Sequence, residues 1–256
     1  MTSSLLTRAR GLLIDLDGTV YQRDQLIAGA DEALAWLRAS GVPFRFVTNT
    51  TMRSRASLAQ RLQRLGIDAA EADILNPATA TARFLRTEGA SAHLLVLDDA
   101  LRDFEGVVVD ERQPKYVVIG DLGDGWTFEI LNRAFRLVLD QNASLIALGR
   151  SRYWQAADGL RLDSGPFVAA LEYATAQTAV VMGKPERAFF EQALRELGLP
   201  ADQVAMIGDD IETDVAGAQR AGLIGALVQT GKFREDDLTR GVWPDFVLAS
   251  LADVRS

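Results

Sequence analysis

The apolar residues of this chain fall into two kinds of pattern that alternate from its start. Short continuous runs predict buried strands at residues 11–14 and 44–47. Stretches with apolar residues every three or four positions predict amphipathic helices at 31–39 and 54–65. A polar loop is expected at 21–28. This β-α-β-α order with short connections is typical of a parallel sheet covered by helices.

The same alternation continues to the end of the chain, with a change of organisation near Pro77. Beyond it, the pattern predicts helices at 78–88, 126–140 and 167–173, and strands at 93–97, 116–119, 144–148 and 179–182. From Gly183 the first pattern resumes, with helices at 186–197 and 214–221 and strands at 204–207 and 226–229. We therefore expect an α/β fold: a Rossmann-like core with a parallel sheet, residues 1–78 and 180–256, interrupted by an inserted α/β domain, residues 79–179.

Composition narrows the classes of function. A hydrophobic content of 48% in 256 residues is ample for a core, and the net charge of −8 argues against a general nucleic-acid binder. The absence of cysteine excludes disulfides, thiolate metal sites and a cysteine nucleophile. The sequence has neither a signal-peptide pattern nor an apolar run approaching a membrane span, so we expect a cytoplasmic protein without a membrane partner.

Two carboxylates follow the first predicted strand directly. Asp15 and Asp17 stand at its carboxyl end, where open α/β sheets carry their chemistry, and Gly18 allows the backbone to approach a ligand closely. Acids in this arrangement can bind a cation and divide two roles, with one attacking and the other moving protons. The structural alternative is an Asp-Gly turn after a strand.

Three other loops carry matching side chains. Thr48 and Asn49 follow the second strand, Lys184 lies in a Gly-Lys-Pro turn before a helix, and a later strand ends in Asp209 and Asp210, with Asp214 one helical turn on. Each has an ordinary explanation by itself: a helix cap, a surface lysine, turn residues, or an acid favoured by a helix dipole. Together they form a set of oxygen donors suited to Mg²⁺ next to a site for a phosphate group.

The four motifs as a set resemble those of the haloacid dehalogenase superfamily of aspartate-nucleophile phosphatases. The resemblance covers essentially the whole chain, and the insert between the second and third motifs is similar to the large α/β cap of the NagD-like, C2-capped subclass. Further segments resemble the branch that contains phospholysine phosphohistidine inorganic pyrophosphate phosphatase and haloacid dehalogenase-like hydrolase domain-containing protein 2: residues 149–153, 165–167, 170–174 and 230–233.

The resemblance implies a Mg²⁺-dependent phosphatase. Asp15 would be the nucleophile that forms an aspartyl-phosphate, and Asp17 would protonate the leaving oxygen and then deprotonate the attacking water. The metal would be held by Asp15, by the backbone carbonyl of Asp17 and by Asp209. The phosphoryl oxygens would be held by Thr48, by the Asn49 backbone and by Lys184. Asp214 would orient metal-bound water, while Asp210 would share that task or hold the loop.

The expected cap would select the substrate, a small phosphorylated compound whose identity stays open. Where many relatives carry an Asn-Pro-Asp-type loop, this chain has residues 149–153, so their substrate preferences do not transfer. Arg150 and Arg152 are candidate contacts to an anionic substrate, or else surface arginines. A homodimer formed through the cap is an expectation at the level of the family. We expect a structural role for the single histidine, His93.

Three other functions fit parts of the pattern. A phospho-receiver signalling domain shares the acid cluster and lysine but lacks a second acid two residues after the acceptor and a large insert. A dehalogenase of the same superfamily uses an aspartate nucleophile but needs neither Mg²⁺ nor an acid at position 17. A non-catalytic binding protein would not need a competent residue at every motif position, as this chain has. The phosphatase interpretation accounts for all four motifs.

Overall fold

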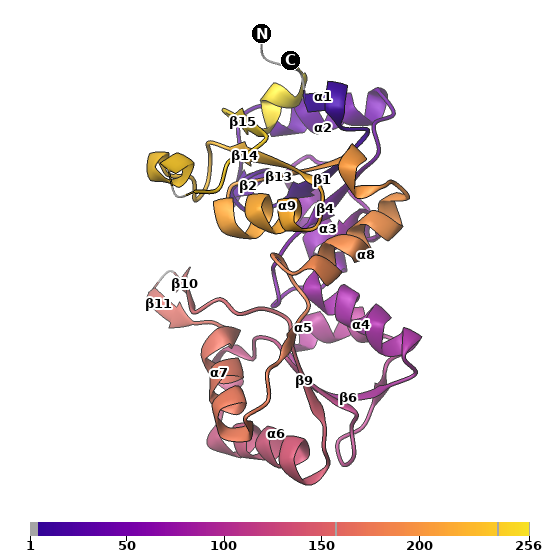
Figure 1. Ribbon diagram of the computed structural model, residues 1–256, viewed down its shortest axis with the longest axis vertical. Coiled ribbons are helices and arrows are strands. Elements are labelled where there is room, and N and C mark those ends of the chain that lie inside the picture. The colour runs from indigo at the N-terminus through magenta and orange to yellow at the C-terminus, as the bar shows by residue number, and fades with distance from the viewer. Residues whose placement is uncertain (1–4, 157, 240, 256) are drawn as a thin grey trace. The chain divides into compact units, whose positions relative to one another are not determined.

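The computed structural model describes residues 5–156, 158–239 and 241–255, which form two compact units (Figure 1). The first unit comprises Met1–Thr48, Leu58–Leu75 and Lys184–Ser256, and the second comprises Asn49–Ser57 and Asn76–Gly183. The domain bounds expected from the sequence also include residues 1–4, 157, 240 and 256, which lie outside the described residues.

The first unit is built on a parallel six-stranded sheet in the order β15-β14-β13-β1-β4-β5. Its strands are β1 (Gly11–Asp15), β4 (Phe44–Val47), β5 (Ile74–Leu75), β13 (Val204–Gly208), β14 (Ile224–Val228) and β15 (Phe246–Leu248). Strands β1 and β13 are buried throughout and mostly apolar, as expected of the centre of a sheet covered on both faces. This sheet confirms the predicted α/β fold class.

Helices connect the strands of the first unit. They are α1 (Leu5–Arg8), α2 (Ala30–Ala39), α3 (Arg55–Arg64), α8 (Arg187–Leu197) and α9 (Gly217–Arg220), with a π-helix at Ile211–Ala216 and 3-10 turns at Glu71–Asp73, Ala201–Gln203, Glu235–Thr239 and Leu251–Arg255. Leu12 and Ile14 of β1 share one buried cluster with apolar residues of α2 and α3. The helical spacing of these apolar residues in the sequence is therefore the spacing that packs against the sheet.

The second unit has its own parallel sheet, in the order β12-β9-β8-β6-β7. Its strands are β6 (Ser91–Leu95), β7 (Val108–Val109), β8 (Tyr116–Ile119), β9 (Ser144–Ala147) and β12 (Val180–Val181), and a separate hairpin consists of β10 (Tyr153–Ala156) and β11 (Gly159–Leu162). Its helices are α4 (Pro77–Thr87), α5 (Asp98–Leu101), α6 (Phe128–Asp140) and α7 (Ser164–Thr175), with 3-10 turns at Arg102–Phe104 and Gly123–Gly125. Val118 and Ile146 pack with α4, whereas Val117 and Leu145 pack with α6 and α7. The sheet is therefore covered by helices on both faces.

The structure corrects several sequence predictions. The polar loop expected at 21–28 contains an antiparallel hairpin of β2 (Tyr21–Gln22) and β3 (Gln25–Leu26). Two-residue strands are too short to show an alternating pattern, which is also why β5 and β7 were not predicted. The strand expected at 93–97 runs from Ser91 to Leu95, and the helix expected at 214–221 begins earlier, as the π-helix that leads into α9.

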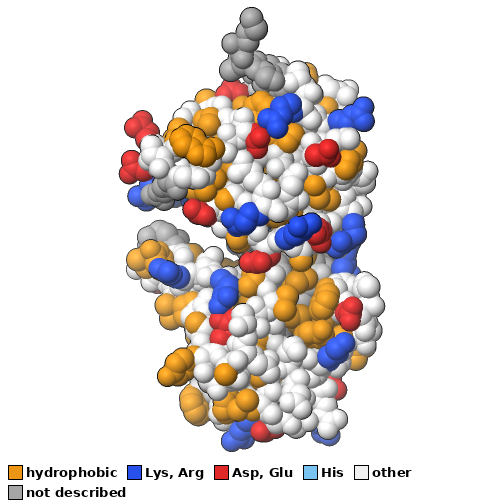
Figure 2. Space-filling model, viewed as in Figure 1, with side chains coloured by type: hydrophobic (Ala, Val, Ile, Leu, Met, Phe, Trp, Pro, Cys, Tyr) orange, Lys and Arg blue, Asp and Glu red, His pale blue; other side chains and the backbone are white. Residues whose placement is uncertain are grey.

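One face of the molecule carries side chains of mixed character. Basic, acidic and apolar side chains are interspersed over the face drawn in Figure 2. Within the part of the chain that the structure describes, none of the helices combines the length and apolar composition needed to cross a bilayer.

Replacement of Phe46 by alanine should strongly destabilise the first unit. Phe46 is fully buried in β4, and its ring packs edge-on against Phe44 with centroids 5.4 Å apart. The cavity left behind should cost about 3–5 kcal/mol of unfolding free energy, whereas Trp243→Ala, at a side chain 73% exposed, should cost less than about 0.5 kcal/mol. Urea denaturation of both variants measures this, and equal midpoints would contradict the described core.

Candidate active site

The candidate site lies at the carboxyl edge of the first unit's sheet. Asp15 is the last residue of β1 and pairs in register with Val47 of β4, while Ile14 pairs with Ile207 of β13. Residues that follow β4 and β13 therefore emerge beside Asp15. The side chains of Asp15, Thr48 and Asp209 are all buried there. The Thr48 amide donates to the Leu75 carbonyl of β5, at 3.1 Å, which fixes the direction in which the chain leaves β4.

Lys184 bridges two of the buried acids. Its Nζ lies 2.5 Å from Asp15 Oδ1 and 2.7 Å from Asp214 Oδ1, and its side chain is only 3% exposed. Burial by itself disfavours the ammonium, but the two carboxylates outweigh burial and raise the pKa of Lys184. Lys184 is therefore a permanently charged group that holds Asp15 and Asp214 in place.

Three buried carboxylates converge here. One oxygen from each of Asp15, Asp209 and Asp214 lies within 4.8 Å of the other two. Burial raises the pKa of Asp209 to about 6, although the Lys232 amide opposes it, and burial likewise raises the pKa of Asp214 to about 6, opposed by Lys184. The pKa of Asp15 is also raised, by burial and by Asp209, against the opposing charge of Lys184. Three acids facing one buried ammonium leave an excess of negative charge.

Glycines make room for the acids. A Cβ at Gly18 or at Gly231 would lie 2.0 Å from Asp209 Oδ2, and both glycines have positive φ, +88° and +61°. A Cβ at Gly208 would lie 2.2 Å from Asp214 Oδ2. A glycine is therefore required at each of these positions if the carboxylates are to stay where they are.

Asp210 and Asp214 have different environments. Asp210 Oδ1 accepts hydrogen bonds from the amides of Glu212 at 3.1 Å and Thr213 at 3.0 Å, so Asp210 caps the π-helix. Burial by itself would raise the pKa of Asp210, but these amides and Lys232 outweigh burial and lower it. Asp214 turns back into the cluster, where its Oδ2 accepts from the Asp210 amide at 3.2 Å. Asp210 thus holds the loop, while Asp214 belongs to the acid group.

Asp17 lies apart from the three converging carboxylates. Its side chain is exposed, yet partial desolvation of the carboxyl raises the pKa of Asp17. The positive charge of Arg61 lowers this pKa but does not outweigh the desolvation. The next residue, Gly18, donates its amide to the Tyr21 carbonyl at 2.7 Å. Arg61 of α3 stacks 4.3 Å over the Tyr21 ring, so the β2–β3 hairpin is anchored beside Asp17.

The remaining predicted site residues belong to the second unit. Asn49 is its first residue, and a Cβ at Gly183 would lie 2.9 Å from Asn49 Oδ1, so the two chain segments of this unit run close together there. Arg150 forms an ion pair with Glu172, and Arg152 is exposed. His93 is buried in β6, and burial lowers its pKa.

Sequence reasoning assigned no site residue to the segment after β14, which contacts the acid cluster. The amide of Lys232 donates to Asp209 Oδ2 at 2.7 Å, and its Nζ lies 3.3 Å from Asp210 Oδ2. Thr230 Oγ1 donates to the Gly18 carbonyl at 2.6 Å. One signal was available: lysine occurs only at 115, 184 and 232, and Lys232 follows a predicted strand at the same edge of the sheet.

The arrangement is suited to binding a hard cation and an anion side by side. Carboxylate oxygens are the donors that Mg²⁺ and Ca²⁺ prefer, and the excess negative charge of the cluster is what such an ion would neutralise. Buried Lys184 and the hydroxyl of Thr48 are groups that bind phosphate or carboxylate oxygens.

Comparisons with known proteins agree with this geometry. Residues 12–110 match the family model described as haloacid dehalogenase-like hydrolase, and residues 181–254 match a HAD-hydrolase-like model. The chain is 47% identical over 228 residues to haloacid dehalogenase-like hydrolase domain-containing protein 2 of Bos taurus, covering 89% of this chain and 87% of that protein. It is 42% identical over 237 residues to phospholysine phosphohistidine inorganic pyrophosphate phosphatase of the same species, covering 91% and 87%.

A solved structure extends the similarity to nearly the whole fold. The p-nitrophenyl phosphatase from Archaeoglobus fulgidus superposes with a TM-score of 0.90 at 32% identity, covering 97% of this chain and 99% of that one. With the two matching family models and relatives above 40% identity over most of their length, the chain belongs to the haloacid dehalogenase-like hydrolase family, in its phosphatase-type branch.

Proposed function

We propose that this protein is a Mg²⁺-dependent phosphatase that hydrolyses small phosphorylated substrates through an aspartyl-phosphate on Asp15. The observation that carries the proposal is the position of Lys184 between Asp15 and Asp214, at the sheet edge where Asp209 also lies. The names of two relatives, a phospholysine phosphohistidine inorganic pyrophosphate phosphatase and a p-nitrophenyl phosphatase, support the reaction class.

Asp15 is the nucleophile of the proposed reaction. One of its carboxylate oxygens forms a bond to phosphorus while the bond from phosphorus to the leaving oxygen breaks. Asp17 donates a proton to that leaving oxygen and takes one from the water that then hydrolyses the aspartyl-phosphate. The side chain of Asp17 is exposed, and partial burial of its carboxyl raises its pKa, a shift in the direction that favours proton donation.

The phosphoryl oxygens are held by groups that precede or follow strands at one edge. Lys184 supplies a fixed positive charge, Thr48 a hydroxyl, and the Asn49 backbone an amide. Because Lys184 already contacts Asp15, it also aligns the attacking carboxylate and favours its ionised form.

The acid cluster is the proposed Mg²⁺ site. Asp15, Asp209 and the backbone carbonyl of Asp17 would hold the ion, and Asp214 would orient water at the site, while Asp210 fixes the loop that carries Asp209. When bound, Mg²⁺ lowers the repulsion between the Asp15 carboxylate and the phosphate dianion. The oxygen-only donor set and its excess negative charge fit this ion.

The two expected domains take separate roles in this proposal. Residues 1–78 and 180–256 form the catalytic core, and residues 79–179 form a C2-type cap that selects the leaving group. Arg150 and Arg152 are its proposed substrate contacts, and Arg152 is the first to test because Arg150 is already paired with Glu172. A homodimer formed through the cap and a cytoplasmic location complete the proposal.

Replacement of Asp15 by asparagine should abolish hydrolysis, because a neutral amide cannot attack phosphorus. Release of p-nitrophenol from its phosphate ester, and hydrolysis of acetyl phosphate for the case in which the aryl group is rejected, measure this with Mg²⁺ and with EDTA. We expect wild-type turnover that is lost with EDTA and lost in Asp15→Asn. Activity that survives both changes, or its absence with both substrates in the wild type, would contradict the proposal.

Mg²⁺ affinity should fall as the pH drops below about 6, because the acid cluster binds the ion in its ionised form and the pKa values of Asp209 and Asp214 are raised to about 6. Without metal, the folded state holds more protons than the unfolded state between the ordinary pKa of 3.8 and about 6. The stability of the metal-free protein should therefore decrease as the pH rises across that window, and Mg²⁺ should restore it at neutral pH.

Calorimetric titration with Mg²⁺ and thermal melting, each repeated across this pH range, measure both effects. Asp209→Asn serves as the control, since it should weaken Mg²⁺ binding and flatten the pH dependence of metal-free stability. An affinity for Mg²⁺ that does not change with pH would contradict the assigned site.

Gly231→Ala should lower activity sharply, because its Cβ would displace the Asp209 carboxylate. Gly66→Ala is the matched control: Gly66 also has positive φ, +87°, but a Cβ there would meet nothing within 4 Å. Both variants carry the strain of a positive φ, but a Cβ at Gly231 would also lie 2.5 Å from Gly18 Cα, so the melting temperature of Gly231→Ala should fall further. A parallel loss of kcat/KM in Gly66→Ala would show that strain, not displacement of Asp209, lowers the activity.

A further inference from the structure

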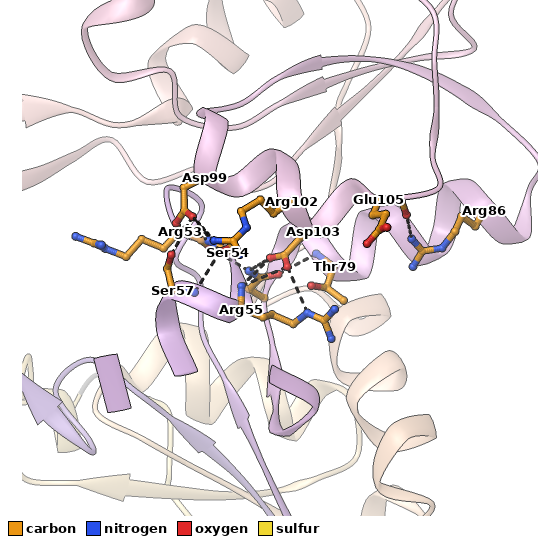
Figure 3. Close-up of polar contacts among 11 residues, drawn as sticks. Arg53, Ser54, Arg55, Ser57, Thr79, Arg86, Asp99, Arg102, Asp103 and Glu105 are labelled. Carbon is orange, nitrogen blue, oxygen red and sulfur yellow. Dashed lines mark hydrogen bonds and ion pairs between the residues drawn. The ribbon is translucent and has the colours of Figure 1, made fainter. Parts of the chain in front are cut away.

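The start of α3 is held by two carboxylates from a distant part of the chain (Figure 3). Segment Asn49–Ser57, which contains the first turn of α3, belongs to the second unit together with Asp99 and Asp103. The catalytic scheme proposed above uses neither of these two aspartates.

Asp99 accepts hydrogen bonds from Ser54, the residue that precedes α3. Its Oδ2 accepts the Ser54 amide at 3.0 Å, and its Oδ1 accepts the hydroxyls of Ser54 at 3.0 Å and Ser57 at 2.8 Å. Burial by itself would raise the pKa of Asp99, but these hydrogen bonds outweigh burial and lower it. Arg102, 3.6 Å away, is its cationic neighbour on the solvent side.

Asp103 is buried and ties the same turn to α4. It accepts the Arg55 amide at 3.0 Å and Asn76 Nδ2 at 2.7 Å. Asn76 is itself fully buried, donates to the Arg53 carbonyl at 3.2 Å, and caps α4 by accepting the Thr79 amide at 2.8 Å. Residues 53–55 are therefore fixed to two helices of the second unit at once.

This anchoring exceeds what capping of α3 requires. Ser54 Oγ already accepts the Ser57 amide at 3.2 Å, which is the ordinary local cap of a helix. Asp99 and Asp103 add charge-assisted bonds from 45 and 48 residues further along the chain. Such bonds fix the position of the segment relative to the rest of its unit as well as the helix end.

The anchored segment begins at Asn49, whose backbone is assigned above to the phosphoryl group. Only Thr50 to Arg53 separate Asn49 from the residues that Asp99 and Asp103 hold, and they form neither helix nor strand. At its other end, Asn49 packs against Gly183 within the same unit. The loop that carries Asn49 is thus short and tied down at its far end.

We propose that Asp99 and Asp103 are positioning residues for phosphoryl binding, acting through the segment Asn49–Ser57 by fixing the Asn49 backbone. The proposal rests on the proposed phosphatase function. Because Asn49 would contact the phosphoryl group and not the leaving group, loss of either aspartate should affect all substrates alike. A misplacement of about 1 Å in such a group is enough to lower a rate up to about a hundredfold.

The test compares Asp103→Ala, Asp99→Ala and the milder Asp99→Asn with a matched control, Asp110→Ala. Asp110 lies in the same unit and also accepts two backbone amides, from Arg112 at 2.8 Å and Gln113 at 3.0 Å, but it holds only its own loop. Three readouts are needed: kcat and KM for acetyl phosphate and p-nitrophenyl phosphate, inhibition by inorganic phosphate, and amide hydrogen exchange of residues 49–57.

We expect Asp103→Ala and Asp99→Ala to lower kcat/KM about tenfold or more, by the same factor for both substrates. Inhibition by inorganic phosphate should weaken, and exchange of residues 49–57 should quicken, while Asp110→Ala changes none of these. Asp99→Asn keeps one acceptor oxygen and should recover part of the loss. It is also the variant to rely on if Asp103→Ala does not fold, since the Asp99 side chain is 34% exposed.

Three results would overturn the proposal: a lower melting temperature with kinetics and phosphate inhibition unchanged, a loss confined to one leaving group, or unchanged exchange of residues 49–57. Failure of this inference is distinguishable from failure of the proposed function. A wild type that hydrolyses neither substrate refutes the function. An active wild type whose activity is abolished by Asp15→Asn but unchanged by Asp103→Ala refutes only the positioning role.

Discussion

The contact of Lys184 with Asp15 and Asp214 is the interaction on which the rest of the site depends. Removing three carboxylates from water is costly, and the single buried ammonium compensates only part of that cost. Burial, with a smaller contribution from the neighbouring acids, raises the pKa values of Asp209 and Asp214, and a divalent cation would stabilise their ionised forms. Selection for a stable fold alone would favour apolar residues at these positions. The buried acids lower the stability of the fold, and this loss is best explained by a role of the cluster in binding and chemistry.

The parallel sheet explains how residues distant in sequence reach one edge. Strands β1, β4 and β13 lie side by side with their carboxyl ends together, so the loop after each contributes to the same site. The close approach of these loops requires residues without a Cβ, and Gly18 and Gly208 meet that need. The site is therefore specified jointly by strand order, by acids at strand ends and by glycines beside them.

Much of the fold and of the candidate site was predictable because the signals lie in short stretches of the sequence. Aliphatic runs that end in acids predicted β1 and β13. The acids at the ends of these two runs are Asp15 and Asp209. What the sequence did not reveal depends on tertiary contacts: the amide of Lys232 on Asp209, and the hydrogen bonds of Asp103, which join segments 48 residues apart. The short β2–β3 hairpin was missed because its strands are too short to show an alternating pattern, and the helix expected at 214–221 starts earlier than predicted, at Ile211.

The most direct test of the central claim is to trap the phosphoryl group on the enzyme. Acetyl phosphate has a leaving group that needs little protonation, so Asp17→Asn should still be phosphorylated but should hydrolyse the product slowly. Mass spectrometry after acid quenching should then find one phosphoryl group, labile to hydroxylamine, on the peptide that contains Asp15, and none in the Asp15→Asn, Asp17→Asn double variant. A phosphoryl group on another residue, or steady turnover of acetyl phosphate without any trapped phosphoenzyme, would contradict the account.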